Sequence, residues 1–228
     1  FMTGMLACAD LAEFGTPEQS SVIMEEYEKS GQSVAALCLS EPAAGSDNQG
    51  MTMTSKKQAD GTYVLNGQKT WVTNGADVPY LLVICKDEDP ARENRDMSLW
   101  LVKRETEGVS TAHLTKLGQH TVPFVDVFFD NVVVTEDQRI GGAGEGWLLL
   151  MKNFEFERCL VVAQGLGLAQ AAQNDAVQYA KDRIAFNKPI ITNPRVQDLI
   201  TENEKILQQS RWWLYYCLWK LDQGESIN

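Results

Sequence analysis

The chain has 228 residues, of which 44% are hydrophobic and 22% charged, which is enough apolar material for a sizeable core and excludes a disordered chain. Its net charge of −11 argues against binding to nucleic-acid phosphates or anionic lipid as a main activity. No apolar run approaches the roughly 18 residues that a membrane-spanning helix needs. We therefore expect a soluble globular protein that contacts neither nucleic acid nor membrane.

Cysteine and histidine residues are few and scattered. The five cysteines form no CxxC pair, which suits reduced, buried thiols in a reducing compartment. The two histidines, His113 and His120, have no cluster of further ligands around them, so the sequence predicts no metal site. With only two histidines, a hydrolase site of the Ser-His-Asp or Cys-His type is also hard to build. We expect a cytoplasmic protein, or one of the mitochondrial matrix if the source is eukaryotic.

Residues 1–32 have the pattern of a helical region. In the stretch TPEQSSVIMEEYEKSG, Thr16 is a suitable N-cap, Pro17 occupies the first helical position and Gly31 follows the last turn. The sequence begins and ends in the middle of a pattern, so we expect it to be a piece of a longer protein.

Residues 33–140 change to a strand pattern. Five stretches rich in β-branched and aromatic residues follow one another: SVAALCL, TYVLNGQKTWVTN, PYLLVICK, MSLWLVKR and FVDVFFDNVVV. The dipeptides Asp60-Gly61, Asn66-Gly67 and Asn74-Gly75 favour hairpin turns between them. Strands joined by short turns, with no helices between them, predict an antiparallel sandwich or barrel.

Residues 141–228 return to a helical period after the hinge GGAGEGW. At 100° per residue, a set of mostly apolar residues falls within about 60° of one line, which predicts a packing face. The face consists of Trp147, Met151, Phe154, Arg158, Val161, Val162, Gly165, Ala169 and Ala172. A second helix is predicted to start near residues 193–195. It carries an aromatic group, interpreted first as core or helix–helix packing and second as a ligand platform: Trp212, Trp213, Tyr215, Tyr216 and Trp219.

The order of helices, strands and helices, with SEPAAGSD (40–47) at the entry to the β segment, resembles the acyl-CoA dehydrogenase family. Three further motifs occur in the family's order and spacing: NGQKTWVTNG (66–75), FEFERCLVVAQGLGLAQ (154–170) and YAKDRIAFNKPI (179–190). The resemblance covers essentially the whole chain and implies an α+β multidomain fold.

The resemblance divides the chain into three parts. Residues 1–32 would end an N-terminal α domain, and residues 33–140 would form a middle β domain that binds flavin and acyl-CoA. Residues 141–228 would supply the first helices of a C-terminal helical bundle. Members of the family are longer at both ends, which agrees with the expectation of a piece.

The chemistry follows from the same resemblance. In this family a carboxylate takes a proton from Cα of an acyl-CoA thioester while N5 of FAD takes the β-hydrogen as hydride. We expect this oxidoreductase reaction of fatty acid metabolism, or the reverse enoyl-CoA reduction, for the whole protein. The 228-residue piece alone is expected to be inactive and nearly free of flavin. The sequence looks closest to members that act on short or polar acyl groups, including the crotonobetainyl-CoA reductase type.

Partners are implied as well. Acyl-CoA would be the substrate, an electron-transferring flavoprotein would receive the electrons, and the full-length protein would be a homotetramer or homodimer.

Residue by residue, the resemblance implies cofactor contacts for Leu37, Leu39, Ser40, Gly45, Ser46, Trp71, Val72, Thr73, Arg183 and Phe186. Ser40 would contact the flavin pyrimidine, and Ser46 would also contact the acyl-CoA. Trp71 and Thr73, two apart and so on one face of a strand, would cover the flavin and bond near N5. Arg183 would reach the flavin pyrophosphate of a neighbouring subunit, with Phe186 packed beside it. Taken alone, SEPAAGSD is also compatible with an ordinary Glu-Pro turn, and Trp71 with a core position.

Several positions depart from the family pattern. Leu37 and Ala43 replace residues that are often tyrosine and glycine. In the third segment, Ala185 stands where a hydroxyl residue is common, Asn187 where glycine is usual, and Pro194 where a glutamine usually touches the adenine end of the cofactor. These departures predict weaker or altered cofactor affinity, and Pro194 predicts a shifted start of the second helix.

The catalytic base is assigned to Glu157. Most family members place the base near the C-terminus in a Glu-Gly-Thr-type motif, which is not present in this chain, but a minority place a glutamate just before an arginine on the first C-terminal helix. Glu157-Arg158 matches that position, at the edge of the predicted packing face, where burial raises a carboxyl pKa toward a value suited to a base. Substrate contacts are implied for Ser46, Glu155, Glu157 and Arg158. Two alternatives stay open. Glu157 lies near acyl-CoA without being the base, or it lies at the edge of the buried face and compensates the charge of Arg158.

Two other functions remain besides the dehydrogenase. An acyl-CoA oxidase on the same fold would differ by rapid reaction of the reduced flavin with oxygen. A non-catalytic family member would use the scaffold for protein association, as the missing base motif and the departures near the adenine end suggest.

Overall fold

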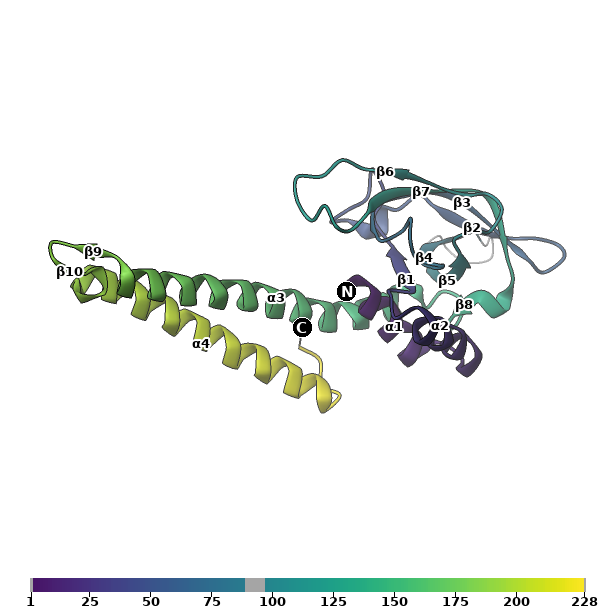
Figure 1. Cartoon of the computed structure of the whole chain (residues 1–228). Helices are drawn as coiled ribbons and strands as arrows, with labels where there is room; N and C mark the ends of the chain where they lie inside the picture. Colours follow the sequence, from purple (N-terminus) through teal and green to yellow (C-terminus); the bar gives the residue numbers. More distant parts are fainter. Residues whose placement is uncertain (1, 89–96, 228) are drawn as a thin grey trace. The chain divides into compact units, whose positions relative to one another are not determined.

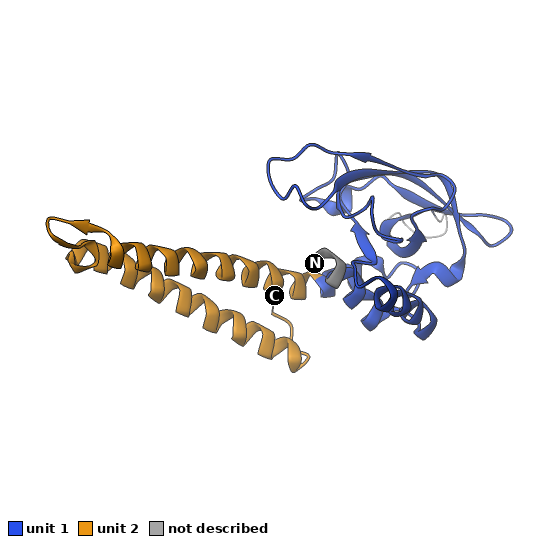
Figure 2. Cartoon of the chain, in the orientation of Figure 1, with its two compact units in different colours: residues 1–153 blue, residues 154–228 orange. Residues whose placement is uncertain are grey.

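The computed structural model describes residues 2–88 and 97–227. The chain divides into two compact units, residues 1–153 and residues 154–228, drawn blue and orange in Figure 2. The first unit holds a pair of helices and an eight-stranded sheet, and the second holds a helical hairpin. This is the predicted succession of helices, strands and helices. The predicted division at residues 33 and 141 stays a prediction, since the boundary between the compact units lies further along the chain.

The first unit begins with helices α1 (Met2–Phe14) and α2 (Pro17–Ser30). Thr16 caps α2 in a reciprocal box: its hydroxyl accepts from the N–H of Gln19 at 3.3 Å, and its own N–H donates to Oε1 of Gln19 at 2.9 Å. Gly31 ends the helix in the left-handed region with φ 62°, which glycine adopts without strain. The N-cap, the proline and the closing glycine predicted from the sequence are confirmed.

A single sheet forms the body of the first unit (Figure 1). Its strands are β1 (Ala35–Cys38), β2 (Thr54–Lys57), β3 (Tyr63–Thr73), β4 (Tyr80–Asp87), β5 (Met97–Lys103), β6 (Val109–His113), β7 (Phe124–Val134) and β8 (Arg139–Ile140). They run in the order β6-β7-β3-β2-β4-β5-β8, with β1 also paired to β4. The pairings β1–β4 and β2–β4 are parallel, whereas a purely antiparallel sheet was expected. The parallel pairing of β2 with β4 arises because β2 lies between β3 and β4 in the sheet. The turn after β3 therefore leads to β4, which is not the neighbour of β3 but runs in the same direction as β2.

The core of this unit is apolar and aromatic. Trp100 on β5 is fully buried, and the ring of Tyr63 packs against it at a tilt of 51°, with ring centroids 4.9 Å apart. The guanidinium of Arg139 lies 4.2 Å from the Trp100 ring and 3.8 Å from Oδ2 of Asp87, so a buried cation is compensated by a ring face and a carboxylate. Burying one side chain of this size contributes about 2–3 kcal/mol.

Two of the three turn dipeptides form turns, and the third does not. Asp60-Gly61 and Asn74-Gly75 lie in turns as predicted. Asn66-Gly67 lies inside β3, where the register with β7 shifts between Leu65 and Gly67. The prediction of a hairpin there was wrong because Gly67 continues β3 opposite a bulge in β7, and it is held by close packing: its φ is 146°, and a Cβ built on it would lie 2.7 Å from the side chain of Met53.

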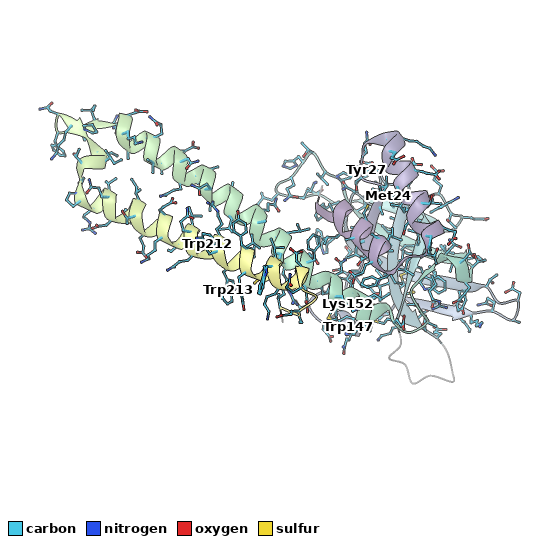
Figure 3. All side chains as sticks on the ribbon, turned by 90° about the horizontal axis from the view of Figure 1, so that it is seen from below. Met24, Tyr27, Trp147, Lys152, Trp212 and Trp213 are labelled. Carbon is cyan, nitrogen blue, oxygen red and sulfur yellow. The ribbon has the colours of Figure 1, made fainter. Side chains whose placement is uncertain are left out.

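The second unit is an antiparallel helical hairpin. Its elements are α3 (Gly146–Asp182, whose first turns belong to the first unit), β9 (Ile184–Ala185), β10 (Lys188–Pro189), the 3₁₀ turn η3 (Ile190–Thr192) and α4 (Pro194–Asp222). Figures 1 and 3 both show α3 and α4 side by side. The helix start predicted near residues 193–195 is confirmed, and Oδ1 of Asn193 accepts from the N–H of Arg195 at 3.0 Å as its cap.

The two helices meet along one narrow seam. On α4 the apolar residues turned inward are three, four or seven positions apart: Val196, Ile200, Leu207, Leu214, Cys217 and Leu221. Polar contacts join the helices as well, since Nε2 of Gln173 donates to the carbonyl of Ile200 at 2.8 Å, and Arg211 donates to Oε1 of Gln170 at 2.8 Å.

Two packing predictions for these helices were wrong in the described chain. The aromatic group on α4 is exposed, with Trp212 and Trp213 showing 70% and 67% of their surface (Figure 3). Val161 and Val162, central to the packing face predicted on α3, are about half exposed. A pair of helices covers only the stripe that each turns to the other, and the remaining apolar residues stay uncovered.

In the described part of the chain, no helix combines the length and the apolar character needed to cross a membrane.

Candidate functional site

The first motif follows β1 and forms a closed turn. In β1, Ala36 and Cys38 enter the core and Ala35 is also buried, while Leu37 and the following Leu39 are half-buried. The turn is closed by a pair of backbone hydrogen bonds between Glu41 and Ala44, of 2.9 and 3.1 Å. Ser40 is half-buried before the turn, and Gly45 and Ser46 are exposed after it.

The second motif ends β3 in a bulge that turns Trp71 outward. The register with β7 shifts between Lys69 and Val72, and Trp71 has φ 58°, an unusual value for a bulky residue. Its indole is 58% exposed, so the alternative that it is a core residue is wrong. Val72 points into the core and is 1% exposed, and Thr73 is half-buried. Strained residues that expose a large side chain cluster at functional sites.

Direct contacts join the two motifs. The N–H of Thr70 donates to the carbonyl of Ser40 at 2.8 Å. The ammonium of Lys69 donates to the carbonyl of Leu39 at 2.9 Å and to Oε1 of Glu41 at 3.0 Å. These bonds join residues 39–41 to residues 69–70, directly before Trp71 to Thr73, and the side chain of Val72 is buried in the core instead of offered to a ligand.

The exposed end of the first motif leaves open space. A Cβ built on Gly45 meets no described protein atom within 4 Å, so packing inside the chain does not require glycine there. At Gly75, by contrast, an added Cβ would lie 2.7 Å from Val72 and 2.8 Å from Val125. Gly75 is therefore a packing glycine, while Gly45 leaves room for close approach of a ligand to the backbone.

A cavity of about 560 Å³ lies in the first unit next to the second motif. Asn74, which directly follows Thr73, lines it together with Met24 and Tyr27 of α2, both labelled in Figure 3. Sequence reasoning missed this cavity. The signal available was the exposed apolar side of α2, which no predicted neighbour covered.

The loop between the two long helices presents Arg183 and Phe186. β9 and β10 form a hairpin whose two turn residues are Phe186, with φ 52°, and Asn187, with φ 62°. These angles match a type I′ turn, in which asparagine is the best substitute for glycine. The departure at Asn187 therefore preserves the backbone conformation. Phe186 is 96% exposed at the tip, and Arg183 is exposed at the base of the hairpin.

The carboxylates of the third motif lie near the start of the second unit. Glu157 is half-buried, and burial raises the pKa of its carboxyl although the charge of Arg158 lowers it. Glu155 accepts a hydrogen bond from the hydroxyl of Ser226 at 2.7 Å and a longer one from the N–H of Ile227 at 3.3 Å. Glu155 is thus engaged with the end of the described chain, whereas the environment of Glu157 disfavours its charged form.

Sequence reasoning also missed a buried ion pair, Lys69 with Glu41. Its signal was present in the alternation of β3, because Lys69 has the same parity as the buried Tyr63 and Leu65. Among the described residues, no group of three or more His, Cys, Asp or Glu side chains is placed to hold a metal ion.

Two domain models of one family match the chain. They are described as acyl-CoA dehydrogenase, middle domain, over residues 36–132, and acyl-CoA dehydrogenase, C-terminal domain, over residues 144–227. A probable acyl-CoA dehydrogenase of Escherichia coli strain K12 is 36% identical over 217 residues, which are 95% of this chain and 56% of that protein. The chain thus spans little more than half the length of the curated relatives it matches.

Solved structures give the same picture. Butyryl-CoA dehydrogenase from Megasphaera elsdenii superposes with a TM-score of 0.89 at 28% identity, over 96% of this chain and 57% of that one. An acyl-CoA dehydrogenase complexed with FAD, from Bacillus anthracis, gives a TM-score of 0.79 at 26% identity, over 89% of this chain and 34% of that one.

Proposed function

The chain belongs to the acyl-CoA dehydrogenase family and has its fold, and from this premise we propose that the full-length protein is an FAD-dependent acyl-CoA dehydrogenase. The reaction is α,β-dehydrogenation of an acyl-CoA thioester, or the reverse reduction of an enoyl-CoA. One observation carries the proposal: the two motifs implied to hold flavin lie against each other through the hydrogen bond between Thr70 and Ser40.

The surface built at that junction suits a flavin ring. Leu37, Leu39 and the exposed indole of Trp71 offer apolar area to a flat ring system, while Ser40 and Thr73 offer hydroxyls to its polar edge. Open space at Gly45 lets a ligand approach the backbone. The likeness to a relative solved in complex with FAD supports the same cofactor.

The chain's own residues position the reactants. Bound FAD would supply an acceptor for the hydride that leaves Cβ. Ser40 would orient the ring through its hydroxyl, Trp71 would cover one face and keep water away, and Thr73 would bond near the reacting edge. Ser46, exposed at the end of the turn, would contact the acyl-CoA.

Glu157 would take the proton from Cα of the thioester. Half-burial raises the pKa of this carboxyl, which makes its carboxylate a stronger base than that of an exposed glutamate. The bond from Cα to hydrogen breaks with its electrons left on the acyl group, and the hydride departs from Cβ, so the double bond closes with one proton and one hydride removed. Arg158 would stay beside it as a substrate contact, as would Glu155.

The hairpin tip supports assembly from several copies. Arg183 and the almost fully exposed Phe186 would reach the cofactor bound by another subunit, which makes the protein a homodimer or homotetramer. The electrons would pass to an electron-transferring flavoprotein. The five free cysteines of the structure agree with a reducing compartment such as the cytoplasm or the mitochondrial matrix.

Anaerobic titration of the full-length protein tests this function. Adding acyl-CoA thioesters of increasing chain length should bleach flavin absorbance near about 450 nm, and the matching enoyl-CoA should restore it. Glu157→Gln should abolish bleaching while FAD stays bound. A protein that carries no FAD and bleaches with no thioester would instead favour the association role, for which the exposed aromatic group of α4 is the supporting observation.

A further inference from the structure

We propose that the buried ion pair of Glu41 and Lys69 is a positioning pair that fixes Ser40 and Trp71 relative to each other for flavin binding. The inference rests on the proposed function, because it concerns the same surface. Neither side chain can touch a ligand, since Lys69 is 0% and Glu41 2% exposed. Any role in binding must act through the segments that they join.

Lys69 reaches from the second motif into the first. It lies on β3 two residues before Trp71, and its ammonium has three partners: the carbonyl of Leu39 at 2.9 Å, Oε1 of Glu41 at 3.0 Å and the sulfur of Met51 at 3.8 Å. The bond to Leu39 holds the peptide group directly before Ser40. A charged donor makes this hydrogen bond stronger than one between neutral groups.

Glu41 anchors the other side of the turn. Its Oε2 accepts from the N–H and the hydroxyl of Thr52 at 2.6 and 2.8 Å, and its Oε1 accepts from the N–H of Met53 at 3.0 Å as well as from Lys69. Burial would raise the pKa of the Glu41 carboxyl, but these bonds and the charge of Lys69 bring it below its usual value. The carboxylate of Glu41, the residue directly after Ser40, is therefore held by four hydrogen-bond donors.

Stability alone does not account for this arrangement. Replacing a buried ion pair by neutral or apolar side chains of similar volume is often neutral or stabilising, because two charges no longer have to leave water. Such a replacement removes the bond from Lys69 to the carbonyl of Leu39, and Glu41→Gln leaves one acceptor oxygen where the carboxylate offers two to Thr52 and Met53. The pair lies where the two motifs implied to contact flavin meet. Without these bonds, Ser40 and Trp71 would be held less firmly relative to each other, and flavin binding would weaken.

The double substitution Glu41→Gln with Lys69→Met separates the two roles in the full-length protein. Lys69→Met alone leaves an unpaired buried carboxylate and should unfold easily, whereas the double variant should recover most of the thermal stability. A matched control is a second ion pair within the sheet, Asp87→Asn with Arg139→Met; Arg139 lies 3.8 Å from Asp87 and also contacts the exposed Glu136 at 2.9 Å. Asp87 accepts from Ser55 and Ser98 at 2.6 Å, and neither serine belongs to the two motifs.

Two measurements are made on each variant. FAD affinity, followed by fluorescence quenching, should fall about tenfold or more in the Glu41–Lys69 double variant, since small misplacements of contacts have effects of this size or larger. Hydrogen exchange of the amides of residues 37–47, measured without FAD, should accelerate about tenfold or more relative to the rest of the sheet. The control variant should change neither.

A double variant that binds FAD as tightly as wild type, or whose residues 37–47 exchange at wild-type rates, overturns the inference. If the wild-type protein binds no FAD, the proposed function fails. The exchange measurement still decides whether the pair holds the turn, so the two failures are distinguishable.

Discussion

At the residue scale, the backbone φ angles of single residues determine which substitutions the candidate site tolerates. Trp71, Phe186 and Asn187 all have positive φ angles between 52° and 62°, and each lies in a segment implied to contact the cofactor. An L-residue in this region costs about 1–2 kcal/mol relative to its ordinary conformation, and asparagine bears the cost best. The conformation persists because the bulge and the hairpin around these residues impose it.

Asn187 offers a direct test of that cost. Asn187→Gly should leave the free energy of unfolding unchanged or raise it by a few tenths of a kcal/mol, because glycine adopts the same angle freely. Asn187→Val should lower it by about 1–2 kcal/mol, because a β-branched residue is strained at φ 62°. Urea unfolding followed by circular dichroism measures both. Equal stability of the glycine and valine variants would show that the turn does not hold this angle in solution.

Glu157 should make stability depend on pH in one direction. Its folded-state pKa is raised above the ordinary 4.5, so the folded protein holds the proton more tightly than the unfolded chain. Its stabilising contribution is complete below the unfolded pKa and is lost as pH rises through the folded pKa. Glu157→Gln should therefore melt higher than wild type at pH 7 and equal to it near pH 4, as scanning calorimetry can determine. A lower melting temperature at pH 7 would mean that the ionised carboxylate stabilises the fold.

Sequence reasoning at this scale worked where a residue type has one dominant use. The cap at Thr16 and the stop at Gly31 follow from local hydrogen bonding alone, and both are confirmed. Lys69 and Glu41 were missed because burial of a charge depends on partners in another segment, which local patterns do not reveal. The same limit applies to Glu157, whose role as base stays a prediction.

At the element scale, the close packing of β3 on Met53 explains why one glycine cannot vary. Gly67→Ala should lower the free energy of unfolding by about 2 kcal/mol or more, because its Cβ would press on Met53 and its φ is positive. Gly61→Ala is the matched control: φ is 89°, but an added Cβ meets no described atom within 4 Å, so only the conformational cost of about 1 kcal/mol applies. Denaturant unfolding of the two variants compares them. Equal losses would indicate that Met53 moves aside.

The strands and helices themselves were predictable, and their partners were less so. The apolar run of β1 and the start signal of α4 are properties of short sequences, and both elements occur where predicted. The parallel pairing of β1 and β2 with β4 depends on which strands become neighbours, and no local signal specifies that. Asn66-Gly67 resembles a hairpin turn in sequence because a glycine at positive φ suits such a turn, whereas here it fits the close approach of Met53.

At the scale of the whole molecule, exposed aromatic residues should determine how the 228-residue chain behaves in solution. Trp212 and Trp213 should bind the dye ANS and promote self-association, since apolar patches of this kind form interfaces. Trp212→Gln with Trp213→Gln should reduce dye fluorescence several-fold and leave the melting temperature nearly unchanged. Fluorescence titration and sedimentation velocity measure these effects.

Leu214→Ala is the contrasting variant for that experiment. This residue is buried in the seam between α3 and α4, so its truncation should cost about 2–4 kcal/mol of stability and raise dye binding instead. If the double tryptophan variant destabilised the chain as much as Leu214→Ala, the aromatic group would be packing in solution after all.

The pairing of β3 also has a consequence for synthesis on the ribosome. β3 ends at Thr73, but its long partner β7 spans Phe124–Val134, so about fifty residues must be translated before the ladder between them can close. The second unit is a hairpin of two helices that follow each other directly in the sequence, so its helices can pair as soon as both have been translated. Nascent chains therefore pass through a stage in which one edge of β3, with its apolar residues, is unpaired because β7 has not yet been made. At that stage the edge is accessible to chaperones.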